Sequence, residues 1–217
     1  LGSAAGTVYV LFGGGSSGSL SEADIMVNGV IGFNYTGLGL GGGDLVASSG
    51  SSDILIGAPG NDVGGDNSGT IWILEGEGGT GTIEVSDLDN YVTGQSVGDG
   101  IGKSFDVLDF NGDGQDDLLV GSGVSSEGGT NAGSVFVVYG PLSGAVSLAD
   151  ADLIYTGESA ADKFGFAVST SGDTNSDGYD DWIAGAPFDD EGSPDAGAAY
   201  VVNGGLDLVG DAVDVVA

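Results

Sequence analysis

The sequence has no cysteine and no histidine, and lysine and arginine together number only two among its 217 residues. Without cysteine or histidine, thiol catalysis, thiolate metal sites, histidine-dependent triads and histidine-ligated zinc or iron are excluded. With 33 acidic residues and a formal net charge of −31, the chain lacks the cations that phosphate binding requires. This charge therefore argues against nucleic acid and anionic membranes as partners. No apolar run reaches the length of a membrane span.

Glycine and aspartate are abundant instead. Glycine supplies 46 residues without a triplet period, which excludes collagen, and aspartate outnumbers glutamate by 26 to 7. Short carboxylates and glycine favour turns and metal loops over helices. Because 40% of the residues are hydrophobic, the chain is not a disordered polyanion. Carboxylate repulsion must be offset by cations, so we expect an extracellular or cell-surface location in a saline environment.

Two nine-residue segments, 109–117 and 173–181, have the ligand pattern of a calcium loop. Oxygen-bearing side chains stand at positions 1, 3, 5 and 9, glycine stands at position 6, and position 7 can turn its backbone carbonyl inward. Calcium takes roughly six to eight oxygen ligands, and glycine permits the sharp turn. We expect two Ca²⁺ ions. The expected ligands are Asp109, Asn111, Asp113, Gln115 and Asp117, and Asp173, Asn175, Asp177, Tyr179 and Asp181.

Simpler interpretations exist for these acidic segments. Asp, Asn and Gly favour plain turns for local reasons, but two matches in register, 64 residues apart, favour calcium. Asp116 and Asp180, at position 8, are expected to point away from the ion. The Gly41–Asp44 tract is similar to a calcium-binding β-roll, but the nine-residue repetition is missing. We therefore interpret that tract as a linker or turn.

The chain is internally repetitive at the same offset of 64 residues. One set of segments is 53–59, 117–123 and 181–187, and a second is 6–11, 69–74, 133–138 and 197–202. A third set, which ends in Thr-Gly, is 35–37, 92–94 and 155–157. The members are short and rich in β-branched and aromatic residues, and turn residues bound them, which is typical of strands. The aromatic residues shared by the second set are expected to form core between repeats: Tyr9, Trp72, Phe136 and Tyr200.

Each full repeat is predicted to contain four antiparallel strands, which is typical of a β-propeller blade. In the last repeat the strands are expected at 164–170, 181–186 and 198–203, and 153–156 shows the fourth strand of the repeat before it. The fold class is therefore all-β, with fourteen strands in about three and a half blades. The predicted division is a partial blade at 1–36 and blades at 37–94, 95–157 and 158–217.

Phe164-Gly165, followed by a calcium loop and then by Gly185-Ala186-Pro187, resembles the FG-GAP repeat of integrin α-subunit β-propellers and their bacterial relatives. The resemblance covers nearly the whole chain. The second repeat keeps the loop but reads Ile101-Gly102 at the first motif and Gly121-Ser-Gly123 at the second. The first repeat has Leu45, Ala47 and Ser49 at ligand positions and keeps only Asp53, so we expect its loop to lack metal. In this family the calcium loop joins the two inner strands of a blade, and the resemblance implies the same placement here.

Several functions remain open at this point. The first is a calcium-binding extracellular module for adhesion or for binding a protein or glycan, with the loops 62–67, 125–131 and 189–195 on a ligand-facing rim. The second is a structural subunit of a surface filament or matrix that assembles through open blade edges. The third is a non-catalytic ancillary domain of a larger secreted enzyme. The expected partner is another copy of the chain or the remainder of the propeller. No pair of acids is placed across a cleft as a glycosidase requires, so we do not expect an enzyme.

The first residue is Leu1, with neither an initiator methionine nor a signal peptide before it. We therefore expect a mature or excised piece of a longer chain.

Overall fold

The computed structural model describes residues 4–13, 19–47, 50–76, 79–205 and 214–215. These residues form β-strands and three short 3-10 turns, without an α-helix among them. The turns are η1 (Leu20–Glu22), η2 (Val85–Asp87) and η3 (Leu148–Asp150). No helix in this part of the chain has the length and apolar character needed to cross a membrane.

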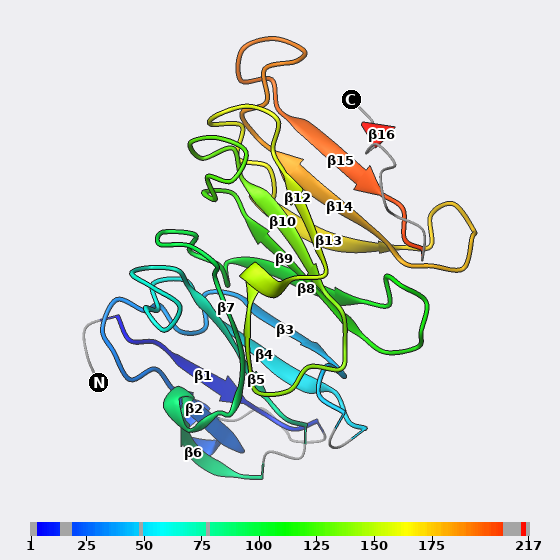
Figure 1. The fold of residues 1–217 in the computed structure, drawn as a ribbon. Coiled ribbons are helices and arrows are strands. Elements are labelled where there is room, and N and C mark those ends of the chain that lie inside the picture. Colours follow the sequence, from blue (N-terminus) through cyan, green and yellow to red (C-terminus); the bar gives the residue numbers. More distant parts are fainter. Residues whose placement is uncertain (1–3, 14–18, 48–49, 77–78, 206–213, 216–217) are drawn as a thin grey trace.

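The strands form four sheets, which follow one another from the lower left to the upper right of Figure 1. The first sheet contains β1 (Thr7–Val10), β2 (Ile25–Asn28) and β6 (Gly81–Glu84). The second contains β3 (Leu40–Gly43), β4 (Asp53–Ala58), β5 (Thr70–Leu74), β7 (Asn90–Thr93) and β11 (Ala145–Ser147). The third contains β8 (Ser104–Leu108), β9 (Asp117–Ser122), β10 (Ser134–Val138) and β12 (Leu153–Thr156). The fourth contains β13 (Ala167–Gly172), β14 (Asp181–Ala186), β15 (Ala198–Val202) and β16 (Asp214–Val215).

The all-β propeller architecture predicted from the sequence is confirmed. The strand orders β12-β10-β9-β8 and β13-β14-β15-β16 are those of up-and-down antiparallel blades. Fourteen strands fill the places expected from the repeats, although β2 rather than segment 35–37 is the second strand of the partial blade, and β6 and β11 are additional. The proposed division at residues 36, 94 and 157 stays a prediction, although the strand sets of the four sheets, apart from β6 and β11, fall within it.

The additional strands tie neighbouring sheets together. β6 lies between β5 and β7 in the chain but pairs in parallel with β2 of the preceding sheet. β11 likewise lies between β10 and β12 and pairs in parallel with β7. The link between the third and fourth strands of a blade therefore extends the sheet before it, and a four-strand repeat pattern gives no signal for this exchange.

The core lies between the sheets rather than within any one of them. Every residue of β5, β9 and β10 is buried, because both faces of these strands are covered by neighbouring blades. The predicted aromatic core is confirmed for Trp72, Phe136 and Tyr200, which are 5%, 0% and 7% exposed. Tyr9 is 39% exposed because β1 belongs to the terminal half-blade.

Two interpretations from the sequence were wrong. Gly41–Asp44 is not a linker, because Gly41 and Gly43 lie in strand β3. A Cβ atom on Gly43 would lie 2.4 Å from Val107 Cγ1, so the glycines allow β3 to pack closely against β8. The Tyr35–Gly37 segment is not a fourth strand either. Strand β2 pairs with β1 in that role, and Thr36-Gly37 lies where Ile101-Gly102 and Phe164-Gly165 lie in the next blades, before the first strand.

Candidate metal centre

The two predicted calcium loops occupy equivalent places in consecutive blades. The segment 109–117 joins β8 to β9, and 173–181 joins β13 to β14, so each connects the first two strands of its blade. Gly114 and Gly178, at position 6, have φ angles of +83° and +96°. A side chain rarely adopts these angles, which is why glycine stands at the turn.

In the loop 109–117, the oxygen side chains turn toward the backbone of the loop itself. Asp109 Oδ2 accepts a hydrogen bond from the Gly114 amide at 3.0 Å. Asn111 Oδ1 accepts from the Asp113 amide at 2.9 Å, and Asp113 Oδ1 accepts from the Gln115 amide at 2.8 Å. The Asn111 side-chain amide also donates to Asp113 Oδ2 at 3.1 Å. The side chains at positions 1, 3 and 5 are therefore gathered around one turn.

The loop 173–181 repeats this network. Asp173 Oδ2 accepts from the Gly178 amide at 3.0 Å, and Asp177 Oδ1 accepts from the Tyr179 amide at 3.0 Å. Asn175 Oδ1 accepts from the Asp177 amide at 2.9 Å, while its side-chain amide donates to Asp177 Oδ2 at 2.7 Å. The same ligand pattern has therefore produced the same local conformation in both blades.

The aspartate at position 9 is fully buried and fastens each loop to its blade. Asp117 Oδ2 accepts from the amides of Phe110 and Asn111 at 3.0 and 3.3 Å, and its Oδ1 accepts from the Gly140 amide at 2.9 Å. Asp181 accepts from the amides of Thr174 and Gly204 at 2.8 and 2.9 Å, and also from the Thr174 hydroxyl.

Asp53 has the same role in the first repeat. It accepts from the amides of Leu45, Val46 and Gly76 at 3.0, 2.9 and 3.1 Å. Position 9 therefore has a structural function that does not depend on a metal. The other ligand positions of that loop carry Leu45, which is fully buried, and Ala47; Ser49 lies outside the described residues.

The electrostatic environment of position 9 differs between the blades. Burial raises the pKa of Asp117 to about 6, although three backbone amides oppose the shift. Burial also raises the pKa of Asp53. Burial acts in the same direction on Asp181, but the hydrogen bonds from the Thr174 hydroxyl and from the Gly204 and Thr174 amides outweigh it, so the pKa of Asp181 is lowered. The hydroxyl donor is absent from the loop 109–117, where Phe110 stands at position 2.

One atom in the first of these loops has no hydrogen-bond partner. Asp109 Oδ1 is buried, and no donor reaches it. A buried carboxylate oxygen without a donor is costly unless a cation approaches it. The surrounding set consists only of carboxylate, amide and carbonyl oxygens, which calcium prefers. The residues present therefore fit a calcium ion.

The carboxylates do not yet converge on a common point. Among the described residues, no group of three or more Asp, Glu, His or Cys side chains is placed to hold a metal. The reason is visible in the loops, where each carboxylate is engaged by amides of its own turn. Positions 1, 3 and 5 of each loop thus share one turn, which the aspartate at position 9 holds through backbone amides, while their assignment as ligands stays a prediction.

The aspartates at position 8 make contacts that sequence reasoning missed. Asp116 Oδ2 accepts from the Asp44 amide at 2.7 Å, and Asp180 Oδ2 accepts from the Asp109 amide at 3.3 Å. Each aspartate points away from its own loop, as expected, but reaches the loop of the preceding blade. The ring of Tyr179 also lies against that blade, because a Cβ atom on Gly112 would be 2.4 Å from it. A repeat pattern shows equivalent positions, not which repeats touch.

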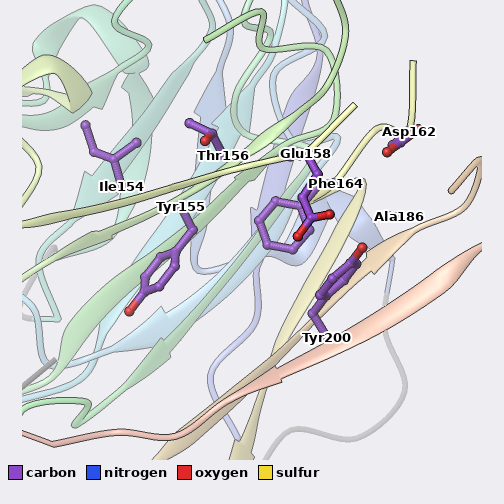
Figure 2. Close-up of a pocket in the computed structure, with 9 residues that line it drawn as sticks. Ile154, Tyr155, Thr156, Glu158, Asp162, Phe164, Ala186 and Tyr200 are labelled. Atoms are coloured by element: carbon purple, nitrogen blue, oxygen red, sulfur yellow. The ribbon is translucent and has the colours of Figure 1, made fainter. Parts of the chain in front are cut away.

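A cavity of about 250 Å³ lies between the third and fourth sheets. Figure 2 shows Tyr155, Phe164 and Tyr200 along it, with Glu158 and Asp162 nearby. The Tyr200 hydroxyl donates to Asp189 at 2.8 Å, and burial together with this hydrogen bond raises the pKa of Tyr200. Burial and the neighbouring Asp189 charge raise the pKa of Asp162. Phe164 and Tyr200 belong to the packed core between the blades, so we assign this cavity to blade packing.

Comparison with known proteins agrees with the repeat structure. The FG-GAP repeat profile matches residues 102–138 and 164–202. Integrin alpha-PS2 of Drosophila melanogaster is 34% identical over 120 residues, which cover 52% of this chain and 8% of that protein. Integrin alpha-8 of Gallus gallus is 30% identical over 173 residues, covering 79% of this chain and 15% of that protein. Integrin alpha-5 of Xenopus laevis is 31% identical over 157 residues, which cover 71% of this chain and 14% of that protein.

The chain thus spans at most about a seventh of the length of these relatives. The matches fall on the blades that carry the two loops and the Phe164-Gly165 motif. Together with the four sheets of propeller type, they establish the family. The chain belongs to the FG-GAP repeat family and forms an integrin α-like propeller module.

Proposed function

We propose that this module binds two calcium ions in its paired loops and meets a macromolecular partner on the opposite rim. The observation that carries the first half is the buried, unpartnered Asp109 Oδ1 within a turn of oxygen side chains. The proposed ligands are the side chains at positions 1, 3, 5 and 9 and the carbonyl at position 7. They are Asp109, Asn111, Asp113, Gln115 and Asp117 in one loop, and Asp173, Asn175, Asp177, Tyr179 and Asp181 in the other.

Calcium would act here as a structural ion. It supplies positive charge where carboxylates crowd a single turn, and two ions offset four of the 31 net negative charges. The attachment of each loop to its blade comes from residues of the chain itself. Asp117 and Asp181 hold their loops against the ends of β10 and β15 through Gly140 and Gly204. Filling the site would therefore fasten the inner hairpin of each blade to its third strand.

The rim opposite the metal loops offers an apolar surface for a partner. The loops that join second to third strands and successive blades carry exposed large hydrophobic residues: Val30, Ile31, Phe33, Tyr35, Leu38, Val63, Val97, Phe166 and Phe188. A hollow of about 410 Å³ on this rim is lined by Tyr35, Leu38, Lys103 and Val124, among others. Tyr35 and Leu38 share this hollow, and exposed apolar side chains on a highly acidic protein favour a binding surface. We propose binding of a protein or glycan in adhesion, rather than catalysis.

The proposed location is extracellular or on the cell surface. We expect these short nine-residue loops to bind calcium weakly, and millimolar calcium outside cells fills weak sites that cytosolic calcium leaves empty. A saline medium would also screen the negative charge of the module. We expect no nucleic-acid partner, because the chain has only two basic residues.

Titration calorimetry of the chelator-treated protein with CaCl₂ tests the metal half of the proposal. We expect two equivalents to bind, one to be lost in Asp113→Ala, and the other in Asp177→Ala. A protein whose calcium binding is the same with both substitutions present would refute the assignment of these loops.

Substitution of Phe33 and Tyr35 by serine tests the rim half, with the full protein and a panel of candidate extracellular proteins and glycans. Calcium binding should be unchanged while partner binding is lost. If the double variant still binds the partner, the partner binds a different surface of the module.

A further inference from the structure

Loop 173–181 holds loop 109–117 of the preceding blade at one of the proposed ligands. Asp180, at position 8 of its own loop, makes two hydrogen bonds to the backbone of Asp109. Its Oδ2 accepts from the Asp109 amide, and its own amide donates to Asp109 O, both at 3.3 Å. Asp109 is also the residue whose buried Oδ1 has no donor. The neighbouring loop therefore fixes the residue that shows the clearest need for a cation.

A second connection between the two loops starts at Asp181, at position 9. Asp181 Oδ1 accepts from the Gly204 amide at 2.9 Å. The next residue, Gly205, donates its amide to Phe110 O at 3.0 Å. Phe110 in turn donates its own amide to Asp117 Oδ2 at 3.0 Å. An unbroken series of hydrogen bonds and peptide units thus links position 9 of one loop to position 9 of the other.

Tyr179, at position 7, adds a packing contact. A Cβ atom on Gly112 would lie 2.4 Å from Tyr179 Cε1, so the ring lies directly on the turn of the other loop. The Tyr179 carbonyl and the Asp181 carboxylate are proposed ligands of their own loop, whereas the Tyr179 ring and Asp180 contact the loop of the preceding blade. Because these three residues are consecutive, an ion held by the first two groups would also fix the groups that contact the other loop.

The preceding pair of loops has similar contacts, although loop 45–53 has no proposed metal. Asp116 Oδ2 accepts from the Asp44 amide at 2.7 Å. The Leu142 amide donates to Leu45 O at 2.7 Å, and Leu45 is a core residue rather than a ligand. Contacts of this kind therefore belong to the repeat, and only the later pair of loops can connect two ions through them.

We propose that Asp180 is a positioning residue for the calcium site of loop 109–117, so that calcium in loop 173–181 strengthens calcium binding there. The inference rests on the proposed function and adds a regulation of the same sites. Ordering a loop around an ion costs conformational entropy. A neighbouring loop that is already ordered removes part of this cost, and each ion then favours the other. Because such coupling is reciprocal, both sites gain by the same factor.

Electrostatic repulsion acts against this coupling. Each loop has three aspartates at ligand positions, so a first ion reduces the negative field that attracts the second. Exposed charges are largely screened beyond about 8 Å at an ionic strength of about 0.15 M, whereas hydrogen bonds and packing contacts between the loops are not. Measurements at this ionic strength therefore report mainly on the contacts, and the coupling should be smaller in low salt.

Amide hydrogen exchange, followed by NMR, tests whether one loop acts on the other. In Asp113→Ala, calorimetry should find one ion, bound in loop 173–181. Saturating calcium should then slow exchange of the Asp109 amide about tenfold, because the occupied loop holds that amide. The Asp44 amide should not change in this variant, since the disabled loop holds it. In Asp177→Ala, by contrast, calcium should slow exchange of the Asp44 amide.

Calorimetry gives the size of the coupling. The product of the two stepwise binding constants of the natural protein is divided by the product of the single constants of Asp113→Ala and Asp177→Ala. Independent sites give a ratio of one, and we expect a ratio of about ten. A ratio of one, or an Asp109 amide whose exchange is unchanged while one ion is bound in Asp113→Ala, would overturn the proposal.

Substitutions at Asp180 separate positioning from charge. Asp180→Ala, measured with and without the two single-site substitutions, should lower the ratio to about one. Asp180→Asn removes the charge but keeps an oxygen acceptor, so it should retain most of the coupling, and Asp89→Ala, at an exposed aspartate in blade 37–94, should leave the ratio unchanged. Equal ratios in the Ala and Asn variants would mean that Asp180 does not act by positioning. A protein that binds no calcium refutes the proposed function, whereas two ions that bind independently refute this inference alone.

Discussion

The loops 45–53 and 109–117 occupy the same place in consecutive blades, yet different forces hold them. Leu45 and Val46, at the first two positions of one loop, are buried in the hydrophobic core between the second and third sheets. In the other loop Asp109 turns into the loop, and only Phe110 enters the core. Both loops keep the aspartate at position 9. In each loop this aspartate accepts hydrogen bonds from three backbone amides.

The comparison separates two functions that a calcium-loop pattern combines. Position 9 closes the loop on its blade, and positions 1, 3 and 5 gather charge around a turn. In the first repeat, where Leu45 and Ala47 stand at positions 1 and 3, burial of Leu45 and Val46 holds the loop instead. The loop 109–117 has no such replacement, so its stability should depend on the ion.

Removal of calcium should have the largest effect. A ligand at about 100 times its dissociation constant stabilises the folded state by about 2.7 kcal/mol, so two sites contribute about 5 kcal/mol. We expect excess chelator to lower the melting temperature by about 10 °C or more, because one kcal/mol corresponds to about 2–4 °C at this size. Differential scanning calorimetry in calcium and in chelator measures the shift. An unchanged melting temperature would mean that loop 109–117 does not depend on calcium and so does not differ from loop 45–53 in this respect.

Leu45→Ala should destabilise the protein by about 3 kcal/mol, as is usual when a buried leucine is truncated. The loss should be the same in calcium and in chelator, because this loop depends on the core. Urea unfolding under both conditions provides the values. Leu20→Ala, at a residue that is 58% exposed, is the matched control. A loss that appears only in calcium would mean that loop 45–53 also binds the ion.

Asp113→Ala should cost about 2.7 kcal/mol in calcium and much less in chelator, since it removes one site. The exposed Asp113 makes only local contacts in the turn. Asp177→Ala should behave alike, and the double variant should no longer respond to calcium. Urea unfolding with and without chelator measures these differences. Equal losses under both conditions would show that these carboxylates act through the turn alone.

Asp116→Ala should cost about 1 kcal/mol, the usual contribution of one hydrogen bond. It removes the acceptor for the Asp44 amide and therefore a link between the end of β3 and loop 109–117. Thermal unfolding in calcium measures the loss, and Asp89→Ala, at an exposed aspartate, should be neutral. If both variants melt alike, this link does not contribute.

The smallest effect concerns the pH dependence at Asp53, whose pKa is raised by burial. The neutral form is then favoured in the folded state. Protonated Asp53 therefore contributes to the free energy of unfolding. This contribution is complete below the usual aspartate pKa of about 3.9 and is lost as the pH rises through the higher pKa of the folded state. In chelator, the stability of the natural protein relative to Asp53→Asn should therefore fall as the pH rises from about 4. A flat difference would mean that Asp53 titrates normally.

The sequence predicted the blades because strands such as β9 and β14 combine apolar runs with sharp turn residues at a fixed offset. It also predicted that each loop joins the first two strands of its blade and turns at the glycine of position 6, because a glycine turn is a local property, whereas the ligand role of the oxygen side chains stays a prediction. Contacts between repeats were not predictable in this way. The parallel strands β6 and β11, the reach of Asp116 to Asp44, and the strand formed by Gly41–Gly43 all depend on which blades meet. Thr36-Gly37 was misplaced because its Thr-Gly resembles a strand end, and only pairing of β1 with β2 reveals its position.

A crystal structure grown in millimolar calcium tests the central claim most directly. The claim predicts one calcium ion in loop 109–117 and one in loop 173–181, with Asp109 Oδ1 among the ligands of the first and no ion in loop 45–53. Empty loops, with Asp113 and Asp177 turned out to solvent under these conditions, would contradict it.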